Sequence, residues 1–85
     1  MSNGLLPLEF LSPGQEAVIK EVAGGMSLRR RLTELGLVRG STIKIIRNDN
    51  FGPIIISLGN GTGSGRLAIG RGMAHKIMVE MVKEV

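Results

Sequence analysis

Three consecutive arginines, Arg29, Arg30 and Arg31, are the residues whose type and spacing point most clearly to a binding chemistry. They lie in the first turn of a short helix expected after Ser27, where the helix dipole favours negative rather than positive charge. Positive charge at a position that the helix dipole disfavours is typical of a functional site or of a specific tertiary partner. Arginines flanked by leucines on a short helix suit an acidic and apolar patch on a protein partner. We therefore expect a docking surface made of Leu28, Arg29, Arg30, Arg31, Leu35 and Leu37.

A solvated helix face is the alternative explanation for the same arginines. Arg30 and Glu34 are four residues apart, so they could form an ion pair worth about a few tenths of a kcal/mol. Runs of exposed charge are usually no more than soluble surface. The sequence leaves both explanations open.

The sequence contains no group of residues with catalytic or metal-ligating spacing. It has no cysteine and one histidine, His75, which has no carboxylate nearby in sequence. A metal site would need further ligands from scattered aspartates and glutamates. No serine lies in a recognisable nucleophile motif. We therefore expect no enzyme activity, no cofactor and no metal site, and a surface or partly packed position for His75.

The glycine-rich run at residues 59–65 has the composition of a phosphate-binding loop. Such a loop is followed by a Lys-Ser or Lys-Thr pair and opens a long helix, and neither signal is present here. We expect the run to be a hairpin connection between two strands.

The net charge is +4, from 11 basic and 7 acidic residues, which favours an acidic partner. Nucleic acid is one such partner. However, Phe10 and Phe51 are the only aromatic residues, so the chain has no platform on which single-stranded bases could stack. Apart from the arginine triplet, the basic residues are spread along the chain. We expect no specific binding of RNA or DNA.

The 85 residues are enough for one small domain, residues 1–85, with a thin core. Apolar residues make up 42% of the chain, which is enough for folding. The first ten residues lack the basic segment and long apolar run of a signal peptide. No apolar run approaches the roughly 20 residues that span a bilayer. The expected location is the cytoplasm, which the absence of cysteine also fits.

Short local signals place the helix that carries the arginines. Ser27 can act as its N-cap, and the leucines that follow recur at helical spacing. Gly36 fits a left-handed helix end, with Leu37 folding back onto Leu32. The methionines of the chain are expected to fill gaps in the core, but Met26 or Met78, if exposed, would offer an adaptable partner surface.

Alternating apolar residues predict five short strands, with the helix inserted after the first. A single helical turn is expected at residues 73–75, after a break at residues 70–72. Closure into a barrel would remove the edges that strands this short would expose. The expected fold class is mainly β, a small and highly curved barrel. The strands cover Glu16–Val22, Thr42–Arg47, Ile54–Leu58, Arg66–Ile69 and residues 76–82.

The helix region resembles the FeoA family, small cytosolic proteins of bacterial ferrous-iron uptake. A glycine pair, Gly24 and Gly25, precedes the segment LRRRLTELGL, and a glycine-led strand follows at residues 39–45. Residues 52–54, reading GPI, and the last strand, around residues 74–80, continue the match. The resemblance covers nearly all of residues 8–83. It implies an SH3-like barrel with the helix in a loop.

The resemblance also implies a partner, the cytosolic GTPase portion of FeoB, the membrane ferrous-iron transporter. On this basis the chain is a non-enzymatic accessory protein that docks on the transporter and regulates it, with no need to bind iron itself. Docking would bias the nucleotide-dependent conformations of the transporter. Whether docking activates or inhibits, whether it needs nucleotide, and whether the chain forms a weak homo-oligomer all stay open.

Two other functions are weighed against this one. The same fold occurs as a C-terminal domain of some metal-dependent repressors, so a stand-alone metalloregulator-type interaction domain in iron-dependent transcriptional control is the alternative. The chain has no winged-helix segment to read DNA, which counts against an intact repressor. A basic RNA-binding barrel is weakened by the missing aromatic residues.

Overall fold

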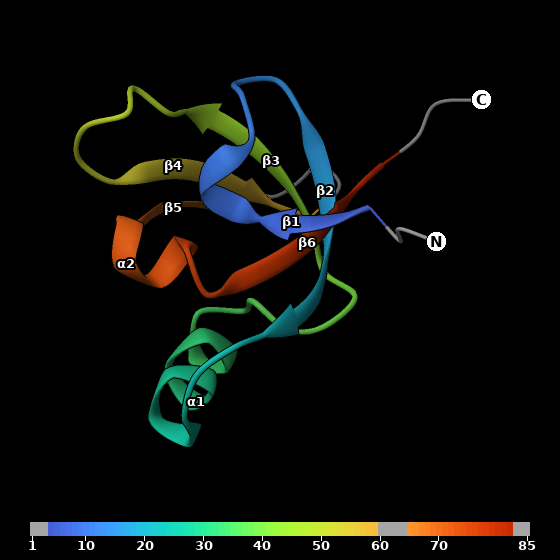
Figure 1. Cartoon of the computed structure of the whole chain (residues 1–85), viewed down its shortest axis with the longest axis vertical. Helices are drawn as coiled ribbons and strands as arrows, with labels where there is room; N and C mark the ends of the chain where they lie inside the picture. Colours follow the sequence, from blue (N-terminus) through green and yellow to red (C-terminus); the bar gives the residue numbers. More distant parts are fainter. Residues whose placement is uncertain (1–3, 60–64, 83–85) are drawn as a thin grey trace.

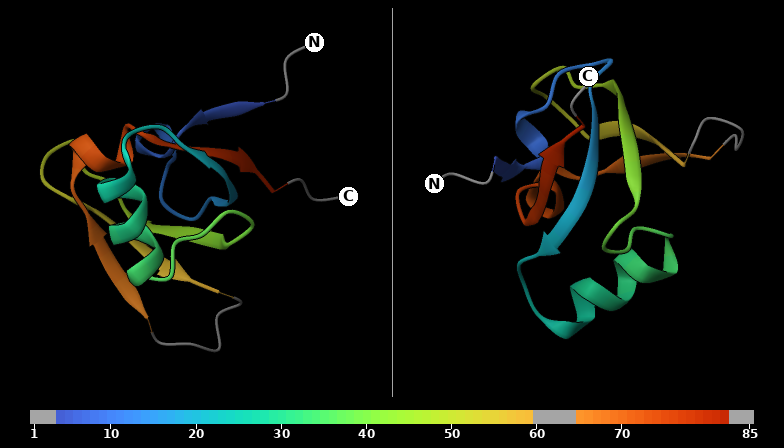
Figure 2. Two further views of the ribbon diagram at one scale, coloured as in Figure 1. Left: turned by 90° about the horizontal axis from the view of Figure 1, so that it is seen from below. Right: turned by 90° about the vertical axis from the view of Figure 1, so that its right-hand side faces the viewer.

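The computed structural model describes residues 4–59 and 65–82, which form one antiparallel sheet of six strands with three short helices (Figure 1). The strand order is β1-β6-β2-β3-β4-β5. The sheet curves around its core, and α1 projects from one end (Figures 1 and 2). The mainly β fold class is therefore confirmed. In chain order the elements are β1 (Leu5–Pro7), the 3-10 helix η1 (Leu8–Phe10), β2 (Glu16–Val22), α1 (Met26–Glu34), β3 (Thr42–Arg47), β4 (Ile54–Leu58), β5 (Arg66–Ile69), α2 (Arg71–Ala74) and β6 (Ile77–Met81).

One apolar core lies inside the curved sheet, because each strand turns alternate side chains inward. In β3, Ile43 and Ile45 are buried while Lys44 between them is exposed, as strand geometry requires. Burial of a Leu, Ile or Val side chain contributes about 1.5–3 kcal/mol to stability. The core consists of Leu8, Leu11, Ala17, Ile19, Leu32, Leu37, Ile43, Ile45, Ile54, Ile56, Ile69, Ala74, Ile77 and Val79.

The sheet has one strand more than the sequence predicts. β2 to β5 have the expected bounds, β6 is slightly shorter than expected, and α2 begins two residues before the expected turn. The additional strand, β1, has three residues and pairs with β6, with Leu5 opposite Glu80. So short a segment carries no readable alternation, and it is extended because β6 offers it an edge. Within the described residues β1 and β5 are the two ends of the sheet, so the barrel is curved but not closed by strand pairing.

β4 and β5 are antiparallel neighbours, with Ser57 opposite Arg66. The glycine-rich run therefore joins two paired strands, as expected. Residues 60–64 of that run lie outside the described residues.

The start of α1 differs from the expectation. Its N-cap is Gly25 rather than Ser27, and no side-chain hydrogen bond caps it. Gly25 is extended (φ −82°, ψ 179°), and its carbonyl oxygen accepts a hydrogen bond from the Arg29 N–H at 3.2 Å. Gly24 before it has φ +130°, which a residue with a side chain rarely adopts. The glycine pair therefore turns the chain from β2 into the helix before Ser27 is reached.

The end of α1 agrees with the expectation. Gly36 is left-handed (φ +88°), and its N–H donates to the Thr33 carbonyl at 3.0 Å. The Leu37 N–H donates to the Leu32 carbonyl at 2.8 Å, which completes a Schellman motif. No helix within residues 4–59 and 65–82 is both long and apolar enough to cross a membrane.

Candidate functional site

The three arginines are exposed on α1, and they point in different directions. Successive residues of an α-helix are separated by about 100°, so three consecutive side chains cannot share one face. Arg29 lies on the side of α1 that faces β2, together with Thr33 four residues later. Arg30 and Arg31 lie on the opposite side. The triplet thus serves two separate surfaces of the helix.

No ion pair neutralises these arginines in the part of the chain that the structure describes. In particular, the pair between Arg30 and Glu34 that the alternative explanation allowed does not form. Three unpaired guanidinium groups remain in solvent on a helix of nine residues. The charge of α1 is therefore available to an external acidic group.

The outer face of α1 is a shallow depression of about 430 Å³, lined by Ser27, Leu28, Arg30, Arg31 and Glu34. Leu28 is half-buried there, because its inner side packs against the core. Leu35, which ends the helix, is 36% exposed and adds apolar surface. This outer face combines cationic and apolar groups, which is the chemistry expected of the docking surface.

Leu37 takes a different place from the other residues of the expected surface. Its side chain is only 2% exposed and belongs to the core cluster. The Schellman motif explains this burial, because it folds the chain back and turns Leu37 under the helix end. Leu37 therefore supports the surface from below and is not accessible on it.

Met26 and Val38 are apolar residues near α1 that the expected docking set leaves out. Met26 is 74% exposed at the first position of the helix, and Val38 is 43% exposed after its end. A flexible, exposed methionine suits an adaptable contact surface. The sequence had indicated such a role for Met26 if it were exposed, whereas it gave no signal for Val38.

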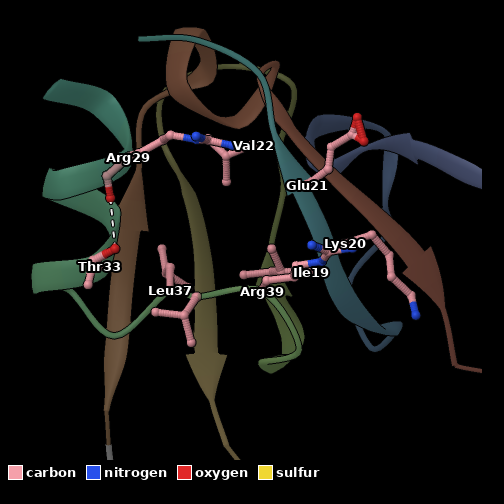
Figure 3. A pocket seen from close by; sticks show the side chains of 9 residues that line it. Ile19, Lys20, Glu21, Val22, Arg29, Thr33, Leu37 and Arg39 are labelled. Carbon is pink, nitrogen blue, oxygen red and sulfur yellow. Dashed lines mark hydrogen bonds between the residues drawn. The ribbon is translucent and has the colours of Figure 1, made fainter. Parts of the chain in front are cut away.

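A groove lies on the other side of α1, between the helix, the second half of β2 and the connection to β3 (Figure 3). Its volume is about 350 Å³. Figure 3 shows the Arg29 side chain extending from α1 toward Val22, while the Thr33 hydroxyl donates to the Arg29 carbonyl at 2.9 Å. The lining residues are Ile19, Lys20, Glu21, Val22, Arg29, Thr33, Leu37, Val38 and Arg39.

His75 follows α2 and does not line either of these surfaces. Its Nδ1 atom is 2.6 Å from Oε2 of Glu9, so folding supplies the carboxylate that the local sequence lacks. The side chain of His75 is 65% exposed. Among the described residues, no cluster of three or more histidine, cysteine, aspartate or glutamate side chains is arranged to hold a metal ion.

Comparison with known proteins identifies the family. The family model of the FeoA domain matches residues 6–81. A protein of Methanocaldococcus jannaschii, described as a candidate Fe(2+) transport protein A, is 45% identical over 76 residues, which are 89% of this chain and 87% of that protein. A crystal structure of an iron uptake regulatory protein, FeoA, has a TM-score of 0.82 and 36% identity, and the match covers 92% of this chain and 99% of that one.

Two more distant structures show the fold alone. The FeoA of Stenotrophomonas maltophilia, solved with zinc and described as a prokaryotic SH3 domain protein, has a TM-score of 0.71 and 24% identity. That match covers 88% of this chain and 89% of the other. A manganese-dependent transcriptional repressor has a TM-score of 0.85 but 15% identity, and the match covers 96% of this chain and only 39% of the repressor. The match of the FeoA domain over residues 6–81 and the 45% identical relative therefore agree, and the chain belongs to the FeoA family, with an SH3-like fold.

Proposed function

We propose that the chain, as a single domain of residues 1–85, is a non-enzymatic accessory protein of ferrous-iron transport. It works in the cytoplasm, where it docks on the cytosolic GTPase portion of a FeoB-type membrane transporter. Docking biases the nucleotide-dependent conformations of the transporter and thereby regulates it. The name of the 45% identical relative, which refers to Fe(2+) transport, supports the assignment to this process.

One observation carries the proposal of docking: α1 presents unpaired arginines beside exposed apolar side chains. Arg30 and Arg31 have no ion-pair partner within residues 4–59 and 65–82, and Leu35 and Met26 are exposed near them. Arginine and large apolar residues are the types that contribute most to the energy of protein interfaces.

The test is a calorimetric titration of the protein into the isolated GTPase domain of the transporter from the same organism, with and without guanine nucleotide. We expect saturable binding that the double variant Arg30→Glu, Arg31→Glu weakens by about tenfold or more, because two charges are reversed at the contact. Lys44→Glu is the matched control, since Lys44 is exposed on β3 and lies outside both surfaces of α1. A difference in affinity between the titrations with and without nucleotide would show which state of the transporter the protein favours.

Two outcomes would contradict the proposal. If the double variant binds as well as the unchanged protein, the outer face of α1 is not the docking surface. A pool of RNA and DNA is titrated in parallel, and salt-sensitive binding to that pool without binding to the GTPase domain would replace transporter docking with nucleic-acid binding.

A further inference from the structure

The groove between β2 and α1 contains a strand position that the chain leaves empty. β3 pairs with β2 only at Glu16, Ala17 and Val18. Two further hydrogen bonds join Ile19 to the start of β3, from the Ile19 N–H to Ser41 at 2.9 Å and from the Gly40 N–H to Ile19 at 2.7 Å. Beyond Ile19, β2 continues to Val22, but the connection to β3 has turned away. In the described residues, this stretch of β2 pairs with β6 alone.

A β-bulge turns one backbone amide of β2 toward this empty position. The register between β2 and β6 shifts between Ile19 and Glu21. After the shift, the Ala23 N–H donates to the Lys76 carbonyl beside β6 at 2.7 Å. Because successive backbone groups of a strand face opposite sides, the N–H and C=O of Val22 face away from β6 and into the groove. This segment is an edge onto which another strand could add.

The charge around the groove is mainly positive. Arg29 and Arg39 line it and have no ion-pair partner among the described residues, whereas Lys20 is paired with Glu80 at 3.4 Å. Glu21 is the one acidic residue of the lining. The two free guanidinium groups come from opposite walls, Arg29 from α1 and Arg39 from the connection to β3 (Figure 3). An acidic segment in the groove would therefore meet a cation on each side.

Apart from Thr33, the remaining residues of the lining are apolar. Ile19 and Leu37 are buried core residues whose surfaces form the floor, and Val38 is 43% exposed at the rim. A peptide of alternating acidic and apolar residues matches this lining, since an extended chain presents alternate side chains to opposite sides.

We propose that this groove binds an extended, acidic peptide segment of a partner protein, which lies alongside β2 as a short added strand. The segment exchanges backbone hydrogen bonds with Val22, and its carboxylates pair with Arg29 and Arg39. This site is separate from the outer face of α1. The proposal does not depend on which protein docks on that outer face. The interaction surface of the chain thus has a sequence-tolerant part, the backbone of β2, and a charge-selective part, the two arginines.

Fluorescence anisotropy with a synthetic peptide tests the proposal. The probe is a short fluorescein-labelled peptide in which glutamate and valine alternate. We expect saturable binding of this peptide and no comparable binding of the version with lysine in place of glutamate. A version with N-methylated central residues, which cannot donate backbone hydrogen bonds, should bind about tenfold more weakly.

Matched variants locate the site. Arg39→Glu is expected to raise the dissociation constant for the glutamate–valine peptide by about tenfold. Arg30→Glu is the control, because Arg30 is equally exposed and unpaired but lies on the outer face of α1. The two charge reversals separate the two proposals: Arg39→Glu weakens the peptide and Arg30→Glu does not, whatever the titration with the GTPase domain shows.

A second readout follows the backbone directly. On addition of the peptide, the amide of Val22 should become protected from hydrogen exchange, while that of exposed Lys44 on β3 should not change in protection. Equal binding of the lysine peptide, or no effect of Arg39→Glu, would overturn the proposal. So would dimerisation of the free protein that Arg39→Glu abolishes, because the groove would then be occupied by a second copy of the chain.

Discussion

The Nδ1 atom of His75 and the Oε2 atom of Glu9 lie 2.6 Å apart, although 66 positions separate the two residues in the chain. Glu9 belongs to η1, and His75 follows α2. The pair therefore joins the start of the chain to the turn before the last strand.

Loss of this pair is expected to have a small effect on stability. The side chain of His75 is 65% exposed, so His75→Ala should lower the free energy of unfolding by less than about 1 kcal/mol. Glu9→Gln should have an effect of similar size. Urea denaturation followed by circular dichroism measures both. A loss above about 2 kcal/mol in either variant would mean that the pair holds η1 on the barrel.

Asn48 is expected to matter much more than His75. Its Nδ2 donates to the carbonyls of Glu9 at 3.0 Å and Leu11 at 2.8 Å, and its Oδ1 accepts from Arg71. Asn48→Ala leaves these partly buried groups unsatisfied, so we expect a loss of about 2–3 kcal/mol in the free energy of unfolding. Lys44→Ala, an exposed change on β3 shortly before Asn48, is the control and should stay within about 0.5 kcal/mol. If Asn48→Ala had the same denaturation midpoint as the unchanged protein, Asn48 would not have this stabilising role.

Substitutions of Leu35 and Leu37 are expected to affect different properties, partner binding for Leu35 and stability for Leu37. Leu37 is 2% exposed and Leu35 is 36% exposed, although both were expected on the docking surface. Leu37→Ala should cost about 3 kcal/mol of stability, as other core leucines do. Leu35→Ala should cost less than about 1 kcal/mol, because the residue keeps much of its contact with water. Thermal denaturation gives the stabilities, and titration with the GTPase domain should show weaker binding for Leu35→Ala. Similar stability losses in the two variants would contradict the assignment.

Gly24 is expected to tolerate no side chain. It has φ +130°, and a Cβ atom there would lie 2.9 Å from Cδ2 of Leu28. Gly24→Ala should therefore lower the free energy of unfolding by about 1–3 kcal/mol. Gly72→Ala is the matched control, since nothing lies within 4 Å of its added Cβ and the residue is helical. That variant should be neutral or slightly stabilising. A neutral Gly24→Ala would show that the turn into α1 can adjust.

The sequence predicted those elements of the fold that are determined by interactions between residues close together in the chain. The bounds of β2 and β3 follow from alternation, and the end of α1 follows from one glycine, Gly36, with a leucine on either side. β1 could not be predicted, because its three residues are extended only where β6 pairs with them. The start of α1 was misplaced because Ser27 is a good cap, but the glycine pair before it turns the chain into the helix already at Met26.

The exposure of the three arginines was predicted from the sequence, but their geometry was not. The triplet Arg29, Arg30 and Arg31 was singled out correctly as exposed charge, yet the helix divides it between two surfaces. The groove was not foreseen, because the orientation of the Val22 backbone in it depends on the register shift between Ile19 and Glu21. Nothing in the identities of those residues signals a bulge. The burial of Leu37 follows from the same Schellman motif that the sequence predicted, so that part could have been inferred.

The place of β6 in the sheet has a consequence for how the protein is made. This last strand lies between β1 and β2, the first two strands of the chain. While the ribosome is still adding residues, β1 has no neighbour at all and one side of β2 stays bare. Such non-local pairing delays folding. The barrel can therefore assemble only after β6 has been synthesised, and a transcript or translation product cut short before Ile77 would yield an exposed, unfinished sheet for quality control to remove.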